Sequence, residues 1–442
     1  MRALLPALAW LPVHAQESDD SPYSAYGFGD LLNANQVVQA TMGGTGVATA
    51  DAFSVSSIQP ASYAGLGKTT FEFGGVGRWV ELSSSSQEQA RQAARILGFS
   101  IGVPFGKGKY GLALGLTPLS DVGYLITDQN ALPDGQAIDY RYEGSGGLNK
   151  AFFGVGGVLW QRRDSLGNGH RLTGGANFNY LFGGIERTRK AEYPGGQNFL
   201  NTQAFSSLIL RGPLGTLGIQ YFGDVRERSD PDDDPLRYVL GAFLEPAMRI
   251  SARLDELTST YTLGSSGVQF PRDTVTISEG VRGNVTIPMA WGIGVGLTSP
   301  VWNVSMEVKR RDWTRLVVDV EGYGLPSEVR AGTTYALGAN WTPLGSRNGS
   351  FLGRTIYRIG ARHTRDYLVV KDQQLAETGV SAGFSFPLLN SMTRSRFNIG
   401  AELGQRGTTA NGALQERFVD VFVGITITPE LRENWFRKRR ID

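Results

Sequence analysis

Large apolar residues alternate with small or polar residues through most of this chain. In 97–103 the odd positions are Leu, Phe, Ile and Val, while the even positions are Gly or Ser. A similar alternation runs through 110–116, 291–297 and 419–427. A period of two places successive side chains on opposite faces of a strand, so the pattern predicts an all-β chain of many strands.

The second face of these strands is small or polar, and it carries charges that a packed apolar core would reject. A soluble β-sandwich with one solvated face explains the same alternation. We favour an antiparallel transmembrane β-barrel, because the strands are many and long and closure leaves no unpaired edge in lipid. Ten polar residues are then expected to face the lumen: Asn177, Asn179, Glu307, Lys309, Asn340, Arg358, Arg362, Asn398, Glu402 and Asp420.

Up to sixteen strands can be counted along the chain. The segments are 69–83, 94–105, 109–126, 149–161, 169–186, 202–212, 214–225, 236–247, 249–262, 285–298, 301–320, 332–343, 353–370, 376–387, 395–406 and 415–428. An even number puts both barrel ends on the periplasmic side, together with the short connections. Four long polar connections are expected outside: 127–148, 187–201, 226–235 and 263–284. Tryptophans near strand ends predict interfacial belts: Trp79, Trp160, Trp302, Trp313 and Trp341.

The stretch from Met42 to Leu66 breaks the alternation. It is rich in Gly, Ala, Ser and Thr and contains a rigid bend at Gln59-Pro60-Ala61. Such irregular backbone must be satisfied by surrounding protein or water. We therefore expect a plug that the following strands enclose.

Within this stretch, Gly43-Gly44-Thr45-Gly46-Val47-Ala48, Asp51 and the later Gln59-Pro60-Ala61 resemble the N-terminal hatch of the FadL/TodX outer-membrane hydrocarbon transporters. Residues 21–31 look like the mature start of the Bacteroidetes branch of that family, which includes PorV-type subunits of the type nine secretion system. The resemblance implies a fourteen-stranded barrel with an N-terminal plug. It also implies passive uptake of hydrophobic compounds, with sideways exit through a break in the wall.

Composition and the N-terminal sequence indicate the cellular compartment and the boundaries of the segments. The chain has no cysteine, which excludes disulfides and thiolate metal sites, and its net charge of +2 gives no indication of nucleic acid as a partner. Residues 1–15 read as a secretory signal, although a buried N-terminal helix is the alternative. We predict a signal peptide at 1–15, a plug segment at 16–67, a barrel at 68–428 and a basic periplasmic tail at 429–442, in the outer membrane of a Gram-negative cell.

Catalytic chemistry is not indicated by the sequence. His170 and His363 are far apart and no nucleophile elbow occurs, so we expect no enzyme, catalytic residue, metal or cofactor. Pro118 lies inside a predicted strand and lacks a backbone donor, so it is a candidate lateral gate. The alternative is that Pro118 already lies in the barrel rim.

Two functions remain open. The first is passive uptake of a small hydrophobic ligand, such as a fatty acid or hydrocarbon, through a plugged barrel in contact with outer-membrane lipid and lipopolysaccharide. The second is a PorV-like interaction subunit that docks envelope or secretion-system proteins. The sequence alone does not name a substrate, because a one-residue slip in a strand would invert every inward-facing position.

Overall fold

The computed structural model describes residues 21–33, 36–49, 51–84, 87–131, 137–165, 167–193, 199–226, 230, 234–264, 267–325, 328–345, 349–388 and 394–429. All structural statements below concern these residues. The predicted signal peptide lies outside them, as does the predicted tail apart from residue 429.

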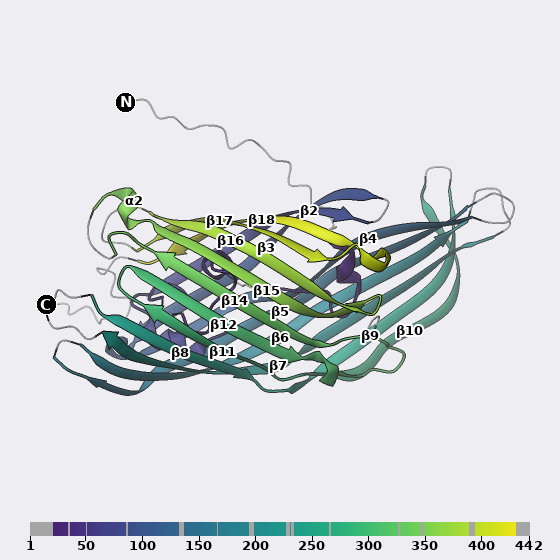
Figure 1. The fold of residues 1–442 in the computed structure, drawn as a ribbon. Coiled ribbons are helices and arrows are strands. Elements are labelled where there is room, and N and C mark those ends of the chain that lie inside the picture. Colours follow the sequence, from purple (N-terminus) through teal and green to yellow (C-terminus); the bar gives the residue numbers. More distant parts are fainter. Residues whose placement is uncertain are drawn as a thin grey trace, which may run out of the picture.

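One antiparallel sheet forms the molecule (Figure 1). Its long strands are β2 (Thr70–Ser83), β3 (Glu88–Phe105), β4 (Tyr110–Ala131), β5 (Ala137–Arg163), β6 (Gly169–Glu192), β7 (Asn201–Arg226), β8 (Leu236–Glu245), β9 (Met248–Leu263), β10 (Gln269–Ile287), β11 (Ala290–Thr298), β12 (Trp302–Asp312), β14 (Ala331–Trp341), β15 (Ile356–Val370), β16 (Gln373–Pro387), β17 (Arg396–Gly407) and β18 (Gln415–Ile427). Because β18 pairs with β2 along its whole length, the sheet closes into a barrel.

The remaining elements are short. They are η1 (Pro22–Ala25), β1 (Asp30–Leu31), α1 (Val37–Ala40), η2 (Pro60–Gly65), η3 (Gly106–Gly108), η4 (Trp313–Arg315), β13 (Val317–Asp319), α2 (Phe351–Arg354) and η5 (Ala410–Gly412). No helix in the described part of the chain is long and apolar enough to cross a membrane.

The strands make fourteen passages through the wall in the part of the chain that the structure describes. Strands β8 and β9 form one passage that is interrupted at Pro246, and β10 and β11 form another that is interrupted at Pro288. The predicted segments 202–212 and 214–225 are one strand, β7, and 236–247 and 249–262 share one passage. The count of sixteen was therefore wrong, because prolines interrupt pairing here without turning the chain. The fourteen strands that the family resemblance implied are confirmed.

Both ends of the barrel and the short connections lie at one end, which we assign to the periplasm. The connection between β7 and β8 also lies at this end, so the prediction of 226–235 as an extracellular loop was wrong. The predicted loops 127–148, 187–201 and 263–284 are largely strand, because β4–β5, β6–β7 and β9–β10 continue as paired hairpins. Figure 1 shows these hairpins rising beyond the rest of the barrel at its right end.

The wall has an apolar outer face and a polar inner face. Outward side chains are exposed on many strands, for example Ile293, Leu337, Ile359 and Leu403 at 55, 50, 64 and 61%. An apolar exterior on a closed barrel suits contact with lipid. One tryptophan differs from the predicted belt, since Trp313 is buried inside, where its ring centroid lies 5.0 Å from that of Tyr367.

The N-terminal chain lies against the inner face of the barrel in two parts. We call residues 21–33 the roof segment and residues 36–49 and 51–66 the floor segment. Roof residues contact the extracellular halves of β4 and β15, for example through Asp30, which pairs with Asp121 of β4. Floor residues contact the periplasmic halves of strands around the whole barrel.

Candidate functional site

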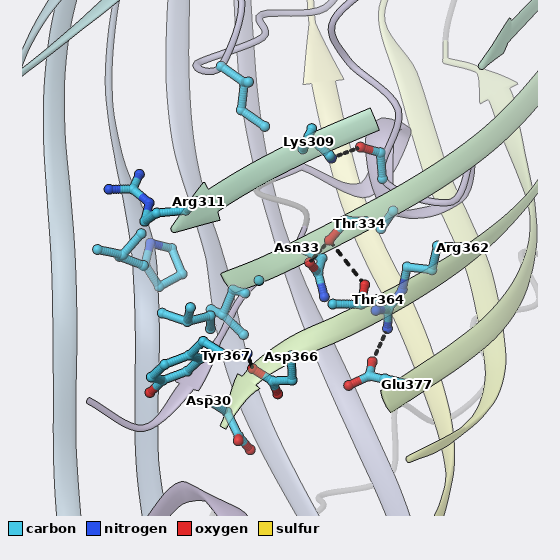
Figure 2. Close-up of a pocket in the computed structure, with 18 of the residues that line it drawn as sticks. Asp30, Asn33, Lys309, Arg311, Thr334, Arg362, Thr364, Asp366, Tyr367 and Glu377 are labelled. Carbon is cyan, nitrogen blue, oxygen red and sulfur yellow. Dashed lines mark hydrogen bonds and ion pairs between the residues drawn. The ribbon is translucent and has the colours of Figure 1, made fainter. Parts of the chain in front are cut away.

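A cavity of about 240 Å³ lies inside the barrel between the two segments, and we call it the chamber. Roof residues Leu31 and Asn33 line it from one side, and floor residues Ala40, Gly44 and Ile58 line it from the other. Figure 2 shows the Thr334 side chain between Asn33 and Thr364, with oxygen to oxygen distances of 3.5 and 3.2 Å.

One side of the chamber holds buried ion pairs, one of which ties the roof segment to the wall. Arg406 of β17 donates to Asp30 at 2.7 Å and to Asp366 at 2.6 Å. Arg362 of β15 donates to Glu402 at 2.8 Å and to Glu377 of β16. Arg78 of β2 makes two bonds with Asp420, at 2.7 and 2.9 Å. Each of these buried charges is paired with an opposite charge, although Arg362 Nη1 and Arg406 Nε have no hydrogen-bond partner among the described residues.

Cations gather on the opposite side of the chamber. Arg311 of β12 and Lys150 of β5 share Glu245 of β8, and the lysine nitrogen lies 3.5 Å from the carboxylate. Lys309 donates to the carbonyl oxygen of floor residue Gly44 at 2.7 Å. The chamber therefore combines charged walls with apolar patches.

We describe the predicted plug motif in four parts: residues 46–48, Gly43, the Gln59-Pro60-Ala61 bend and Asp51. The first two parts each contact one wall residue closely. Glu307 of β12 accepts hydrogen bonds from the backbone N–H groups of Gly46, Val47 and Ala48, at 2.8, 2.6 and 3.0 Å. Successive N–H groups that converge in this way form an anion-binding nest. Gly43 adopts φ +65° and donates to Ser381 of β16 at 3.0 Å.

The other two parts are the Gln59-Pro60-Ala61 bend and Asp51. Gln59 is fully buried, and its amide nitrogen donates to the carbonyl oxygens of Val47 and Ala242, both at 3.1 Å. Pro60 then begins η2, where its missing N–H costs nothing. Asp51 accepts from the N–H of Phe53 at 2.9 Å, which closes a local turn.

Glycines of the wall allow the floor segment to fit this closely. A Cβ atom on any of six wall glycines would stand 2.1–2.5 Å from floor backbone: Gly111, Gly156, Gly175, Gly241, Gly338 and Gly360. Real side chains do not tolerate such distances, so these inner positions accept only glycine without rearrangement. They come from six different strands, β4, β5, β6, β8, β14 and β15, so floor backbone contacts the wall along two arcs of the barrel.

All ten polar residues that were expected in the lumen are buried or half-buried on the inner face. Four contact the floor segment: Asn177, Glu307, Lys309 and Asn340. The other six bond to wall side chains: Asn179, Arg358, Arg362, Asn398, Glu402 and Asp420.

Backbone pairing between β3 and β4 covers only part of their length. Their pairing begins at the periplasmic turn and stops at Phe99 opposite Leu116. Beyond this point, residues 88–98 of β3 pair with β2, and residues 117–131 of β4 pair with β5 and, at two positions, with β1; we call this boundary the seam. Pro118 stands at the first step of the seam and lines the chamber.

The roof segment covers the seam from inside. Strand β1 pairs with Asp121 and Ser120 of β4, and the N–H of Leu32 donates to the carbonyl oxygen of Leu119 at 3.0 Å. Arg95 of β3 reaches across to Asp121 with a nitrogen to oxygen distance of 3.3 Å. The chamber is lined by residues from both sides, including Leu97 and Leu119.

Comparisons with known proteins show the family to which this barrel belongs. The family model described as BamG matches residues 3–442. The chain belongs to the BamG family. No curated protein sequence matches the chain.

Three solved structures share the fold of this BamG-family chain. The toluene transporter TbuX of Ralstonia pickettii matches with a TM-score of 0.54 at 12% identity, and TodX of P. putida with 0.53 at 15%. A FadL homologue of Pseudomonas aeruginosa matches with 0.51 at 10%. Each match covers 90% of this chain and 99% of the other chain. The fold implied by the resemblance to FadL and TodX is confirmed, and the chain is an outer-membrane type of β-barrel, while the Bacteroidetes branch stays a prediction.

The sequence analysis missed several residues of this BamG-family chamber, above all Arg406 and its partner Asp30. Arg406 lies four positions after Glu402, which itself lies four after Asn398, so period two puts all three on one face. This spacing could have identified Arg406 as an inward-facing residue from the sequence alone. Asp366 lies three positions after His363 but pairs with Arg406, whereas His363 contacts Thr378 at 2.8 Å.

Proposed function

We propose that the protein is a passive conduit for small hydrophobic compounds, which enter the chamber from outside and leave sideways through the seam. The roof and floor segments together act as its plug. The observation that carries this proposal is that the chamber is lined by both sides of a boundary at which strand pairing has stopped.

The position of Pro118 supports exit at the seam. Proline has no N–H to donate, so β4 does not offer a complete ladder at this step. Outward apolar residues flank the boundary, with Ile96 at 61% and Phe99 at 41% exposure. A hydrophobic compound that left the chamber here would pass between apolar side chains into lipid.

The floor segment supports sideways exit rather than exit along the barrel axis. Its backbone contacts six strands at glycines and its N–H groups hold Glu307, so a path to the periplasm would break many contacts at once. Movement of β1 away from β4 would break the two residue pairs between these strands, the hydrogen bond from Leu32 to Leu119 and the ion pair of Asp30 with Arg406.

The ligand class rests on the chamber and on the fold. Leu31, Leu97, Leu119 and Phe243 give the chamber an apolar surface, and matched structures are described as toluene transporters. We infer a fatty acid or hydrocarbon-like ligand, with outer-membrane lipid and lipopolysaccharide as surroundings.

A disulfide between the roof segment and β4, which we call the seam disulfide, tests the proposal because it fixes the segment that covers the seam from inside. Leu31 and Ser120 are direct partners in the β1–β4 pairing, at a separation that suits a disulfide. Because the chain has no cysteine, Leu31→Cys with Ser120→Cys forms one defined bond. In cells that express the protein, we expect uptake of labelled toluene and oleate to stop when this bond forms and to return on reduction.

The matched control is Tyr335→Cys with His363→Cys, an outward pair on β14 and β15 that are already fully paired. Oxidation of this control should leave uptake unchanged. Equal uptake by the oxidised and reduced seam variant would refute lateral exit at the seam.

A second function is favoured by the tall β9–β10 hairpin. Phe270, Val275 and Ile277 of β10 are 52, 61 and 58% exposed beyond the main barrel. Exposed apolar residues of this kind mark interaction surfaces. An interaction subunit of the PorV type would crosslink to envelope or secretion proteins from position 275, and its activity would not respond to the seam disulfide.

A further inference from the structure

Beneath the floor segment, three arginines surround a second cavity, of about 170 Å³, which we call the arginine cavity. Arg163 ends β5, Arg171 lies near the start of β6, and Arg237 lies near the start of β8. These strand ends all belong to the periplasmic end of the barrel. Floor residues Ala52, Ala61, Ser62 and Gly65 line it together with these strand ends, and none of its lining residues also lines the chamber.

Arg237 is neutralised by the wall. It donates to Asp224 at 2.8 Å and to the carbonyl oxygen of Gly167 at 2.7 Å. Asp224 also accepts from the N–H of Gly169. This ion pair neutralises Arg237, and it leaves the Asp224 carboxylate of β7 with both oxygens bonded.

Arg171 is held in place but not neutralised. One of its terminal nitrogens donates to the carbonyl oxygen of Ala64 in the floor segment at 2.5 Å, and the guanidinium carbon lies 5.8 Å from the ring centroid of Phe222. Its Nε is buried without a hydrogen-bond partner in the described residues. A buried charged donor without a partner raises the free energy of the folded state, so a hydrogen-bond acceptor that reached Arg171 Nε would be stabilising.

Arg163 lines the same cavity and makes no hydrogen bond or ion pair within the part of the chain that the structure describes. The other carboxylate at the cavity, Asp51, has one oxygen engaged by the N–H of Phe53. Three guanidinium groups thus line the cavity beside two carboxylates, of which Asp224 has both oxygens bonded and Asp51 has one. Like charges held together in this way favour a bound anion.

We propose that the arginine cavity binds an oxyanion from the periplasm, a phosphate or a carboxylate, between Arg163 and Arg171. The planar guanidinium group matches the geometry of such anions. Because Arg171 keeps its bond to Ala64, the bound anion also fastens the floor segment to the wall. The site is separate from the chamber and serves the periplasmic side of the plug.

Binding is tested with the full chain in detergent micelles. Inorganic phosphate is titrated at constant ionic strength, with chloride as the balancing anion, and the heat of binding and the unfolding midpoint are followed. The wild type should bind saturably and its midpoint should rise with phosphate, because a ligand of the folded state stabilises it. Arg163→Gln should weaken binding at least tenfold.

Arg163→Gln removes a side chain without a partner, so the variant is expected to fold. Without phosphate it should be as stable as the wild type or slightly more stable, because one repulsion is gone. With saturating phosphate the order should reverse. The matched control is Arg162→Gln, which removes an exposed neighbour on the same strand and should bind phosphate as the wild type does.

A short acidic peptide distinguishes the source of the anion. If only phosphate binds, the ligand is a free anion; if the peptide binds and phosphate competes, the ligand is a carboxylate of a periplasmic protein. Either result supports the site. Absence of saturable binding by the wild type, or equal binding by Arg163→Gln, overturns it. No uptake measurement enters, so the outcome is independent of the conduit proposal.

Discussion

The floor segment packs its backbone against wall glycines, whereas buried side-chain ion pairs and hydrogen bonds add to the β1–β4 backbone pairing in holding the roof segment. Floor backbone lies against wall glycines of six strands, where even a methyl group would not fit. The roof is fastened by Asp30 to Arg406, by Ser21 to Glu416 and by the Tyr367 hydroxyl, which donates to the carbonyl oxygen of Gly29 at 2.8 Å.

This difference indicates which part moves. Backbone fitted against backbone shifts only if the wall deforms, while a side-chain ion pair can exchange partners with a ligand or with water. We infer that the floor is a fixed base and that the roof is the mobile part of the plug. Four variants test this comparison, and they are ordered here by the size of the expected effect.

The largest effect is expected from Arg406→Gln. This change leaves Asp30 and Asp366 as buried carboxylates without their cation, which costs about 3–5 kcal/mol in comparable sites. The cost should appear first as opening of the roof, measured by faster hydrogen exchange of residues 21–32, while residues 40–48 stay protected. Arg417→Gln on exposed β18 surface is the control. Equal loosening of roof and floor would contradict separate attachment.

The second variant, Gly156→Ala, addresses the floor. The new Cβ would stand 2.3 Å from the carbonyl oxygen of Pro60, so wall or floor must shift. Overpacking of this kind costs about 1–3 kcal/mol, and we expect faster exchange of residues 59–66 with a protected roof. Gly215→Ala is the control, because its Cβ meets no atom closer than 4.0 Å. An unchanged floor would show that the contact is not tight.

The strand pattern was predictable from sequence, and so was the polar inner face. Alternation depends on neighbours along one strand, so Glu307 and Asn177 were placed on the correct side. The strand count was too high because a proline is typical of turns, so the prediction divided one strand into two at Pro213. In the structure β7 continues through it, and the pairing of β7 switches there from β9 to β8.

The contacts between segments were not predictable from sequence. Gly156 and Gly175 read as small residues of a strand, and nothing local indicates that Pro60 lies against both. Pro118 was noted for its missing N–H, but beside it the β3–β4 pairing ends and β4 pairs instead with β1, which is far away in sequence. Such features depend on which strands become neighbours, and a single sequence does not encode that in any local pattern.

The third variant, Tyr23→Phe, sharpens the comparison through pH. The Tyr23 hydroxyl donates to the carbonyl oxygen of Leu414, and burial raises the pKa of Tyr23 to about 12. Because the folded pKa exceeds the unfolded value of about 10, the stabilisation is complete below pH 10 and is lost as pH rises from about 10 to about 12. Loss of the hydroxyl should cost about 0.5–1.5 kcal/mol at neutral pH.

An environment-sensitive dye at Leu32→Cys reports the position of the roof. The dye signal should differ between wild type and Tyr23→Phe at pH 8, and the difference should vanish toward pH 12. Tyr26→Phe, in the same segment, is the control. A difference that persisted at pH 12 would mean that Tyr23 acts through packing rather than through its hydroxyl.

The smallest effect is expected at the seam itself. Arg95 and Asp121 are partly exposed, so a double-mutant cycle with Arg95→Gln and Asp121→Asn should give a coupling of about 0.2–1 kcal/mol. A weak bond is what a lateral gate requires, because the roof must cover the seam without locking it. A coupling free energy well above this range, together with uptake that rises only when the Arg95–Asp121 ion pair is removed, would mean that the ion pair itself keeps the seam closed. The roof would then follow the opening of the seam rather than cause it.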